Sequence, residues 1–336
     1  MRLIDRADAL EDVCRCLRSA GVFGLDTEFI REQSYVPRLC LVQVAVDGEV
    51  HLIDPFAVEL GPFWQLVHDP ETVKVVHAGE QDLEMSYLAS GTISRNVFDA
   101  QVAAGLVGLG ASMSYEALVA ELLGREVSTG SGFSDWSRRP LSNKQIRYAM
   151  SDVAHLVELY EALHARLAQR GRLEWMREEM DALQAEERYA SDPRQAWRRV
   201  RGWKRLSSQR LAVVREMAAW REHAAAEQDV PPRTLLSDKV LRAVARARPG
   251  DAGELATVKG FPRPLARRYG KQVLDAMRRG LSLPGDQRPR PHPQRTLDDD
   301  QRDTVERVMQ AGRDLCARED ISPELFASRD DYAEFV

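Results

Sequence analysis

The sequence predicts an α/β domain built around a mixed sheet, followed by a region that is helical throughout. Short apolar, β-prone runs alternate with segments of helical periodicity over roughly the first 140 residues. After residue 143 only the helical periodicity continues. With 336 residues and 44% hydrophobic side chains, the chain can form two or three folding units with sizeable cores.

The strands of the predicted sheet are short and lie in the first third of the chain. They are expected at residues 22–26, 39–46, 50–54, 73–77 and 96–99. Asp47-Gly48 separates the second run from the third, and this dipeptide favours a two-residue turn between antiparallel strands. Helical periodicity brackets the later strands. This order predicts a mixed sheet covered by helices.

One long helix is expected after Lys144. Its apolar stripe is formed by Ile146, Met150, Val153, Leu156 and Leu159. We expect the α/β domain to extend over residues 1–190. A second, all-helical domain is expected over residues 207–283, where pairs of Pro and Gly interrupt the helices.

The last part of the chain predicts a linker and a further helical segment. The run 283–297 contains four prolines, at positions 284, 289, 291 and 293, which predicts an extended linker over residues 284–297. Residues 298–336 predict a helix at 304–316 and the opening of another small helical domain. Because this segment ends before it could close a core, we expect a second helical domain that is partial, either degenerate or truncated.

The composition predicts a cytoplasmic protein with no membrane association. The first residues, MRLIDRADALEDV, contain acids where a signal peptide needs an apolar core. No apolar run approaches the ~18 residues of a membrane span. The four cysteines form no Cys-x-x-Cys pair and have no accompanying His spacing that suits zinc, so we expect reduced thiols.

Charge is distributed unevenly along the chain. The formal net charge is -5, but residues 192–280 contain 21 Lys and Arg against 9 Asp and Glu, a net charge of +12. Such a basic block could contact phosphates, while an acidic remainder could hold metal ions. Ordinary helices with solvated charged faces would explain the same excess.

Acidic residues at two of the predicted strand ends suggest a metal site. Asp26 and Glu28 lie two residues apart at the end of the first strand, so both carboxylates project from one face. Asp82 is expected in the first turn of the helix that follows the 73–77 strand. Glu80 and Glu84 compete with Asp82 for this role, and acids at a helix start are also common for electrostatic reasons alone.

A third candidate pair lies in the predicted long helix. Tyr148 and Asp152 are four residues apart, so the phenol and the carboxylate share one helix face. Alone, such a pair is most often a partly buried Tyr beside a surface Asp. The three weak patterns together, in this order, are more specific than any one of them.

Three extended stretches resemble the ribonuclease D family of exonucleases. They are FGLDTEFIREQSYVPRLCLVQVA, VVHAGEQDLEMSYL and DWSRRPLSNKQIRYAMSDVAHL, within residues 22–157. The resemblance implies a ribonuclease H-like exonuclease domain. It also implies that Asp26, Glu28, Asp82 and Asp152 bind two divalent ions, Mg²⁺ or Mn²⁺, and that Tyr148 orients the attacking water. Oxygen-only ligands favour these hard cations over zinc.

Two departures refine the resemblance. Position 147 is Arg, where a sister group of exonucleases has a catalytic His, so the tyrosine type fits. Residues 128–134 read STGSGFS, where similar proteins lead us to expect a lysine that contacts substrate. Other substrate contacts are expected from Phe29, His77, Trp136 and Arg139, although packing is an alternative for the Trp.

The basic region resembles the helical HRDC module that RecQ-type helicases share with the same family. The similarity implies that residues 207–283 help to bind or position nucleic acid. Trp197, Trp203, Trp220 and Tyr269 could stack on bases, with core packing as the alternative. Residues 298–336 resemble the start of a second such module.

Together, these resemblances imply a 3′–5′ exoribonuclease that releases nucleoside 5′-monophosphates. Its expected partner is RNA with a free 3′ end, such as a transfer RNA precursor, and no obligate protein partner is evident. A DNA exonuclease remains an alternative, because the same metal site cleaves either polymer. A catalytically silent RNA-binding scaffold is another alternative, although none of the four acids is lost.

Overall fold

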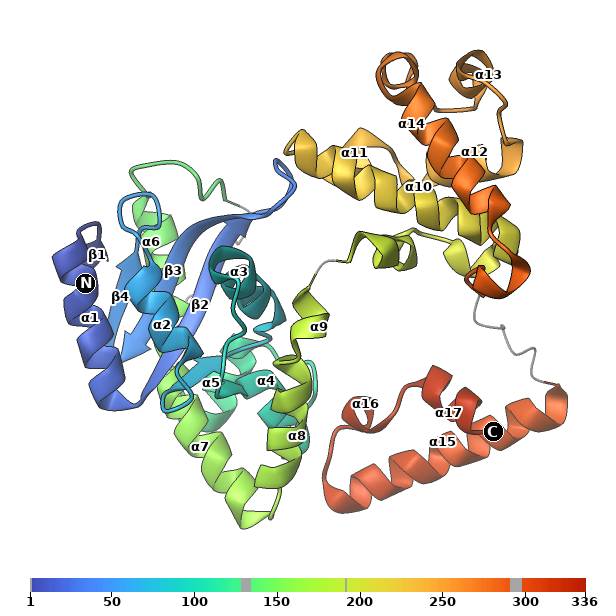
Figure 1. Cartoon of the computed structure of the whole chain (residues 1–336). Coiled ribbons are helices and arrows are strands. Elements are labelled where there is room, and N and C mark those ends of the chain that lie inside the picture. The colour runs from blue at the N-terminus through green and yellow to red at the C-terminus, as the bar shows by residue number, and fades with distance from the viewer. Residues whose placement is uncertain (1, 128–133, 191, 291–297) are drawn as a thin grey trace. The chain divides into compact units, whose positions relative to one another are not determined.

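The structure is a computed structural model that describes residues 2–127, 134–190, 192–290 and 298–336. The chain divides into two compact units, each with its own hydrophobic core (Figure 1). The first unit contains Met1–Ile30, Arg38–Tyr189 and Leu297–Val336, and the second contains Arg31–Pro37 and Ala190–Thr296. Within the described ranges, no helix is long and apolar enough to cross a membrane.

A six-stranded mixed sheet forms the centre of the first unit. Its described strands are β1 (Arg2–Ile4), β2 (Val22–Ile30), β3 (Arg38–Val46), β4 (Glu49–Ile53), β5 (Val73–Val76) and β6 (Val97–Asp99). They are ordered β1-β4-β3-β2-β5-β6. β3 runs antiparallel to β2 and β4, and the other neighbours are parallel. The predicted mixed sheet is confirmed, and β1 is an additional strand that the sequence pattern did not indicate.

The turn between β3 and β4 has the conformation that its sequence favours. Asp47 and Gly48 have φ angles of 50° and 75°, which places both residues in the left-handed region. A type I′ turn requires this pair of conformations, and its twist matches that of the two strands. Val44 therefore pairs with His51 and Gln43 with Leu52.

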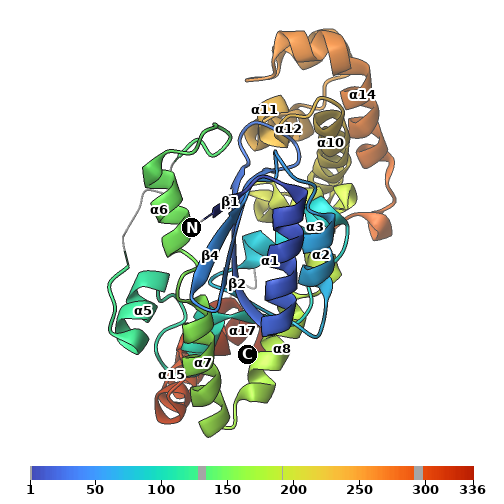
Figure 2. The same cartoon turned by 90° about the vertical axis from the view of Figure 1, so that its left-hand side faces the viewer.

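Helices cover both faces of the sheet, as Figure 2 shows with α1 and α2 on one side and α5 and α6 on the other. The helices of this unit up to residue 189 are α1 (Ala7–Ala20), α2 (Gly61–His68), α3 (Glu80–Ser90), α4 (Ala100–Leu106), α5 (Tyr115–Leu123), α6 (Asn143–Ser151), α7 (Leu156–Gln169), α8 (Leu173–Leu183) and α9 (Glu186–Tyr189). Phe23 of β2 packs on Phe63 of α2, with ring centroids 6.4 Å apart. The next residue, Gly24, points to α7, where a Cβ atom would lie 2.9 Å from Leu156 Cβ. Asp26 and Glu28 follow Gly24 with period two and share its face.

The prediction of a single long helix after Lys144 is wrong, because the chain forms two helices there. α6 ends at Ser151 and α7 begins at Leu156. The break lies against β2, since a Cβ atom on Gly24 would approach the Val153 carbonyl to 3.2 Å. The His155 N–H donates to the Tyr115 hydroxyl at 3.0 Å instead of continuing the helix. Long-range contacts therefore interrupt a locally continuous helical pattern.

The last described segment packs on the first unit. It contains α15 (Asp299–Glu319), α16 (Pro323–Phe326) and α17 (Arg329–Phe335). The Ser322 N–H donates to the Gly105 carbonyl at 3.0 Å. Arg172, which is 7% exposed, donates to the carbonyls of Leu106 and Asp320 at 2.7 and 3.0 Å. The likeness of this segment to a second HRDC module stays a prediction.

The second unit is helical in its described residues. Its elements are the 3-10 helices η1 (Pro193–Arg199), η2 (Trp203–Arg205) and η3 (Gly285–Gln287), and the α-helices α10 (Ser208–Glu227), α11 (Pro232–Leu235), α12 (Asp238–Ala247), α13 (Ala252–Thr257) and α14 (Arg263–Ser282). Trp197, Trp220 and Tyr269 are 5%, 8% and 6% exposed, so these aromatic rings pack in the core. Residues 291–297 of the predicted linker lie outside the described residues.

Candidate metal centre

Three carboxylates meet on the face of the sheet that α7 covers. One oxygen each from Asp26, Glu28 and Asp152 lie within 4.8 Å of one another. Asp26 and Glu28 project from β2, while Asp152 caps the C-terminus of α6. The close approach of the α6–α7 break to Gly24 brings Asp152 to the strand. The structure thus places three of the four predicted metal ligands in one cluster.

Asp82 lies in the first turn of α3, where the sequence pattern places it. It is 7% exposed, and it accepts a 2.5 Å hydrogen bond from the Thr27 hydroxyl. Burial, followed by the negative charge of Asp26, raises the pKa of Asp82 well above its ordinary value. Asp82 is therefore a neighbour of the cluster, although its oxygens are not among the three within 4.8 Å. The competing Glu80 forms an ion pair with Arg188 at 2.8 Å.

The turn that delivers Asp82 is held by Asp99. Ala78 has a φ of 53°, and the N–H groups of Ala78 and Gly79 donate to the Asp99 carboxylate at 3.1 and 2.9 Å. The same carboxylate caps α4 by accepting the Gln101 N–H at 2.8 Å. Four backbone donors, counting Val102, converge on this one side chain. Asp99 thereby fixes the turn from which α3 starts.

Among the residues that the structure describes, the four acids have no positively charged partner. None of them forms an ion pair with Lys or Arg in the part of the chain that the structure describes. Burial raises the pKa of Glu28 to about 9 and that of Asp152 to about 7, and neighbouring carboxylates add to both shifts. Burial and the charge of Asp152 also raise the pKa of Asp26. This concentration of uncompensated negative charge favours cation binding.

The position of Asp152 strengthens the negative potential. The residue occupies the C-cap of α6, and its N–H donates to the Tyr148 carbonyl at 3.2 Å. The carboxyl end of a helix carries about half a negative charge, which disfavours a further carboxylate and favours a cation. The helix end and the side chain therefore attract cations to the same place.

Tyr148 is a neutral hydrogen-bonding group beside Asp152. Its phenol donates a hydrogen bond to the Asp152 carboxylate. Burial and the charge of that carboxylate raise the pKa of Tyr148. The ring packs on Trp136, with centroids 6.1 Å apart. Tyr148 can therefore orient a ligand or water by hydrogen bonding, but it is not an anionic base at neutral pH.

The four expected substrate contacts occupy different environments. Phe29 is half-buried and follows the β-bulge after Glu28. The His77 ring packs edge-on against Tyr115, with centroids 5.9 Å apart. Trp136 is 2% exposed, so its ring packs against Tyr148 and is closed to base stacking. The Gly/Ser stretch at 128–133, which replaces an expected lysine, lies outside the described residues.

Arg139 has a structural role that leaves it no free donor. It forms two bonds with the Asp54 carboxylate, at 2.6 and 2.8 Å. Its other N–H groups donate to the carbonyls of Cys40, Trp136 and Arg138 at 2.7, 2.9 and 2.9 Å. All five guanidinium N–H groups are thereby used. Arg139 ties the segment before α6 to β3 and β4, and a phosphate would have to displace one of these acceptors.

Sequence reasoning missed several residues around the cluster. Thr27 and Asp99 hold Asp82 and its turn, and an Asp that directly precedes a helix is a recognisable N-cap pattern. Glu116 of α5 adds to the raised pKa of Asp152. Gln43 pairs with Asp26 across the β2–β3 ladder, is fully buried, and has both amide atoms unpartnered within the described structure. The isolated Gln in the apolar run LCLVQVAV was its only sequence sign.

Comparison with protein families matches both parts of the chain. A family model described as 3′–5′ exonuclease matches residues 1–168, and the HRDC domain model matches residues 210–277. Ribonuclease D from Gluconacetobacter diazotrophicus is 38% identical over 98% of this chain and 84% of its own length. Ribonuclease D from Granulibacter bethesdensis is 41% identical over 84% of this chain and 72% of its own length.

Comparison with solved structures agrees with these matches to protein families and relatives. The crystal structure of Escherichia coli RNase D, described as an exoribonuclease involved in structured RNA processing, superposes with a TM-score of 0.87. It is 29% identical to this chain and covers 98% of this chain and 88% of its own. The sequence identities, the paired domains and the acidic cluster agree with one another, and the chain belongs to the ribonuclease D family of 3′–5′ exonucleases.

Proposed function

We propose that this protein hydrolyses RNA from its 3′ end and releases nucleoside 5′-monophosphates. The supporting observation is the set of Asp26, Glu28 and Asp152 oxygens within 4.8 Å, with no positive side chain paired to them in the described residues. Together with the adjacent Asp82, these oxygens fit hard divalent ions, Mg²⁺ or Mn²⁺, and four carboxylates suffice to hold two such ions. Bound ions would supply charge for the phosphate oxygens and lower the pKa of the attacking water.

The protein's own groups prepare the reaction. The Tyr148 phenol, which hydrogen-bonds Asp152, stays protonated and positions water beside that carboxylate. The Thr27 hydroxyl fixes one oxygen of Asp82 and leaves the other available for a cation. Trp136 and the Arg139–Asp54 pair hold the segment from which α6, and hence Tyr148, begins. Preorganisation of this kind avoids rearrangement during the chemical step.

We further propose that the substrates are structured RNAs with a free 3′ end, such as transfer RNA precursors. The support is the similarity to the Escherichia coli enzyme, whose structure is described as that of an exoribonuclease involved in structured RNA processing. The HRDC match and the net charge of +12 over residues 192–280 support a role of this region in binding such RNA.

Digestion of 5′-labelled RNA and of DNA of the same sequence tests the proposal. The reactions contain Mg²⁺, Mn²⁺ or chelator, and the variant Asp152→Asn is run beside the wild type. We expect a metal-dependent ladder that shortens from the 3′ end, is faster on RNA, and is absent in the variant. Faster digestion of DNA would instead support the DNA exonuclease, and binding without cleavage under every metal condition would support the silent scaffold.

A further inference from the structure

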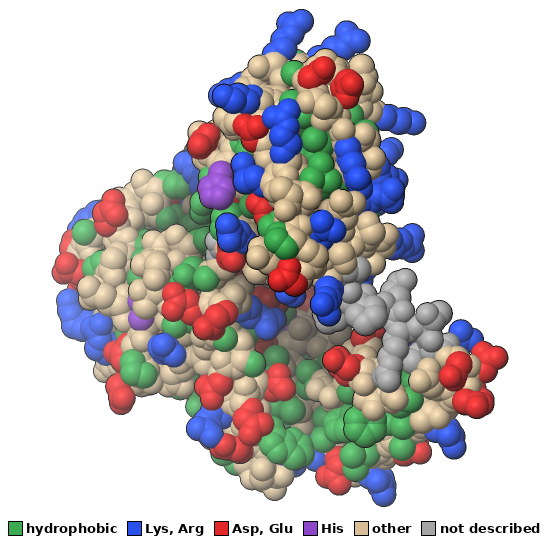
Figure 3. Space-filling model, turned by 45° about the vertical axis from the view of Figure 1, so that its right-hand side comes forward, with side chains coloured by type: hydrophobic (Ala, Val, Ile, Leu, Met, Phe, Trp, Pro, Cys, Tyr) green, Lys and Arg blue, Asp and Glu red, His purple; other side chains and the backbone are tan. Residues whose placement is uncertain are grey.

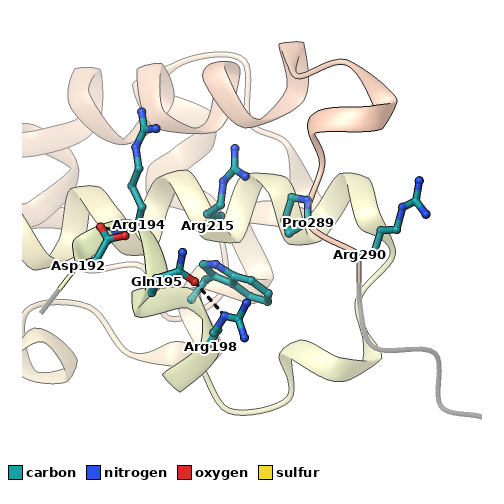
Figure 4. Close-up of a pocket in the computed structure, with 8 residues that line it drawn as sticks. Asp192, Arg194, Gln195, Arg198, Arg215, Pro289 and Arg290 are labelled. Atoms are coloured by element: carbon teal, nitrogen blue, oxygen red, sulfur yellow. Dashed lines mark hydrogen bonds between the residues drawn. The ribbon is translucent and has the colours of Figure 1, made fainter. Parts of the chain in front are cut away.

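We propose that a pocket in the second unit binds the phosphodiester backbone of RNA. The pocket has a volume of about 390 Å³ and is lined by Asp192, Arg194, Gln195, Trp197, Arg198, Arg215, Pro289 and Arg290 (Figure 4). It lies outside the metal centre and mostly outside the residues that the HRDC model matches. The inference rests on the proposed function in one respect, namely that RNA is the polyanion presented to the protein.

The pocket has an excess of positive charge. Four arginines line it, against the single carboxylate of Asp192. That carboxylate is already engaged as the N-cap of η1, where it accepts the Arg194 N–H at 2.8 Å. In the described residues, neither Arg194 nor Arg290 forms an ion pair. Their guanidinium groups therefore remain available to an anion from solution.

Two of the arginines are held in place by the protein. Arg215 donates to the Glu216 carboxylate at 3.1 Å and to the Gln287 carbonyl at 3.3 Å. Arg198 donates to the Gln195 side chain at 2.9 Å, and its guanidinium lies 5.2 Å from the centroid of the Trp197 ring. In Figure 4 the side chains of Arg194 and Arg215 extend in the same direction. A phosphate would thus meet oriented donors, and fewer rotamers would be lost on binding.

The pocket is suited to the backbone and not to the bases. Its single aromatic ring, Trp197, is 5% exposed and packs edge-on against Trp203 at a centroid distance of 4.8 Å. No ring face is therefore open for stacking, and the guanidinium forks match phosphate oxygens. The volume is at the lower end of ligand pockets, roughly 300 to 1,000 Å³. A phosphate with its sugar is the appropriate size of ligand.

The surrounding surface would steer a polyanion to this pocket. Residues 192–280 have a net charge of +12. The face of the second unit that Figure 3 presents carries many Lys and Arg side chains. A general positive field attracts any nucleic acid, whereas oriented arginines in a pocket fix one phosphate. The experiment must separate these two contributions.

Fluorescence anisotropy with a 5′-labelled 20-nucleotide RNA in chelator measures binding without hydrolysis. The test variant is Arg194→Gln with Arg290→Gln. The matched control is Arg263→Gln with Arg267→Gln, which removes the same charge from exposed positions of α14 in the same unit. We expect the Kd of the test variant to rise about tenfold at 0.1 M salt, and its salt dependence to weaken by about two counterions. The control should change Kd less than threefold.

If both variants lost RNA affinity equally, a general positive field would explain the binding and the pocket proposal would be overturned. An unchanged Kd in the test variant would overturn it as well. Arg215→Gln is a second, independent variant whose Kd should also rise. The affinity for DNA of the same sequence should fall by the same factor in the test variant, since guanidinium groups contact phosphate and not the 2′-hydroxyl. Inorganic pyrophosphate that competes at equal phosphate concentration would assign the pocket to free polyphosphates instead. Hydrolysis is measured separately with Mg²⁺, so failure of the proposed function is distinguishable from failure of the pocket.

Discussion

Carboxylates with little exposure to solvent have opposite surroundings in the two units. Asp238 in the second unit accepts hydrogen bonds from Arg221 at 2.8 Å and from the Arg201 N–H at 3.1 Å, and Arg233 lies 3.3 Å away. Although burial opposes it, the bond from Arg221 holds the pKa of Asp238 below its ordinary value. In the first unit, Asp26 faces other carboxylates, and its pKa is raised.

The difference separates stability from function. A buried carboxylate that is paired with a guanidinium is a structural element, because removing either partner leaves an uncompensated charge. A half-buried carboxylate beside other carboxylates destabilises the fold unless a cation is present.

Asp26→Asn should have the largest effect. We expect kcat on RNA to fall roughly 10³-fold, since the bound ions supply several kcal/mol of transition-state stabilisation. The unfolding midpoint in chelator should rise, because a repelled carboxylate is replaced by a neutral amide. RNA digestion and thermal unfolding measure the two quantities. Asp47→Asn in the exposed turn is the control and should keep wild-type activity. A simultaneous fall in kcat and midpoint would contradict the contrast.

Asp238→Asn should have the reverse pattern. We expect the free energy of unfolding to fall by about 3 kcal/mol, because the Arg221 charge stays buried without its counterion. The kcat of the folded protein should stay unchanged. Urea unfolding followed by circular dichroism gives the first quantity. A loss below about 0.5 kcal/mol, which is typical of a neutral surface substitution, would mean that Asp238 does not stabilise the fold through its ion pair.

The acidic cluster should make the stability of the protein depend on pH, and metal ions should offset this dependence. The folded-state pKa values of Asp152, about 7, and Glu28, about 9, exceed the unfolded values near 4. The folded state then binds more protons, so the stability from these groups is full below about pH 4 and is lost as pH rises through 7 and 9.

At pH 8, Mn²⁺ at a hundred times its Kd should restore about 2.7 kcal/mol. Calorimetric unfolding between pH 5 and 9, with Mn²⁺ and with chelator, tests both statements. Stabilisation by Mn²⁺ that is equal at every pH, or equal in Asp26→Asn, would place the ion elsewhere.

Tyr148→Phe should have a moderate effect. A hydrogen bond to a charged group contributes about 2 kcal/mol, so we expect kcat to fall roughly thirtyfold with little change in KM. Single-turnover digestion of RNA separates the chemical step from binding. If the variant were as inactive as Asp26→Asn, Tyr148 would have a role beyond orienting water.

Gln43→Leu should have the smallest effect. It tests whether a buried polar amide lowers the free energy of unfolding, as an unpaired charge does. The buried amide has no partner within the described structure, so an apolar side chain of similar size should raise the free energy of unfolding by about 1 kcal/mol. Urea unfolding in chelator measures the change. Destabilisation would mean that an ordered water or a neighbouring group satisfies the amide.

Local patterns predicted the features that depend on local chemistry. The Asp47-Gly48 turn, the shared face of Asp26 and Glu28, and the place of Asp82 in the first turn of α3 follow from residue type and period. The break between α6 and α7 did not, because the close approach at Gly24 causes it and is distant in sequence. The Arg139–Asp54 pair was missed for the same reason, since 85 residues separate its partners.

The buried position of Arg172 has a consequence for synthesis on the ribosome. Its guanidinium reaches the carbonyls of Glu319 and Asp320, which are translated nearly 150 residues later. The Leu106 carbonyl, its third acceptor, is translated earlier. At 5 to 20 residues per second, the nascent chain lacks the other two acceptors for on the order of ten seconds. Closing so long a segment costs little extra entropy, about 0.6 kcal/mol for each doubling of length. The first unit is therefore completed only when the segment from α15 to α17 has also been synthesised.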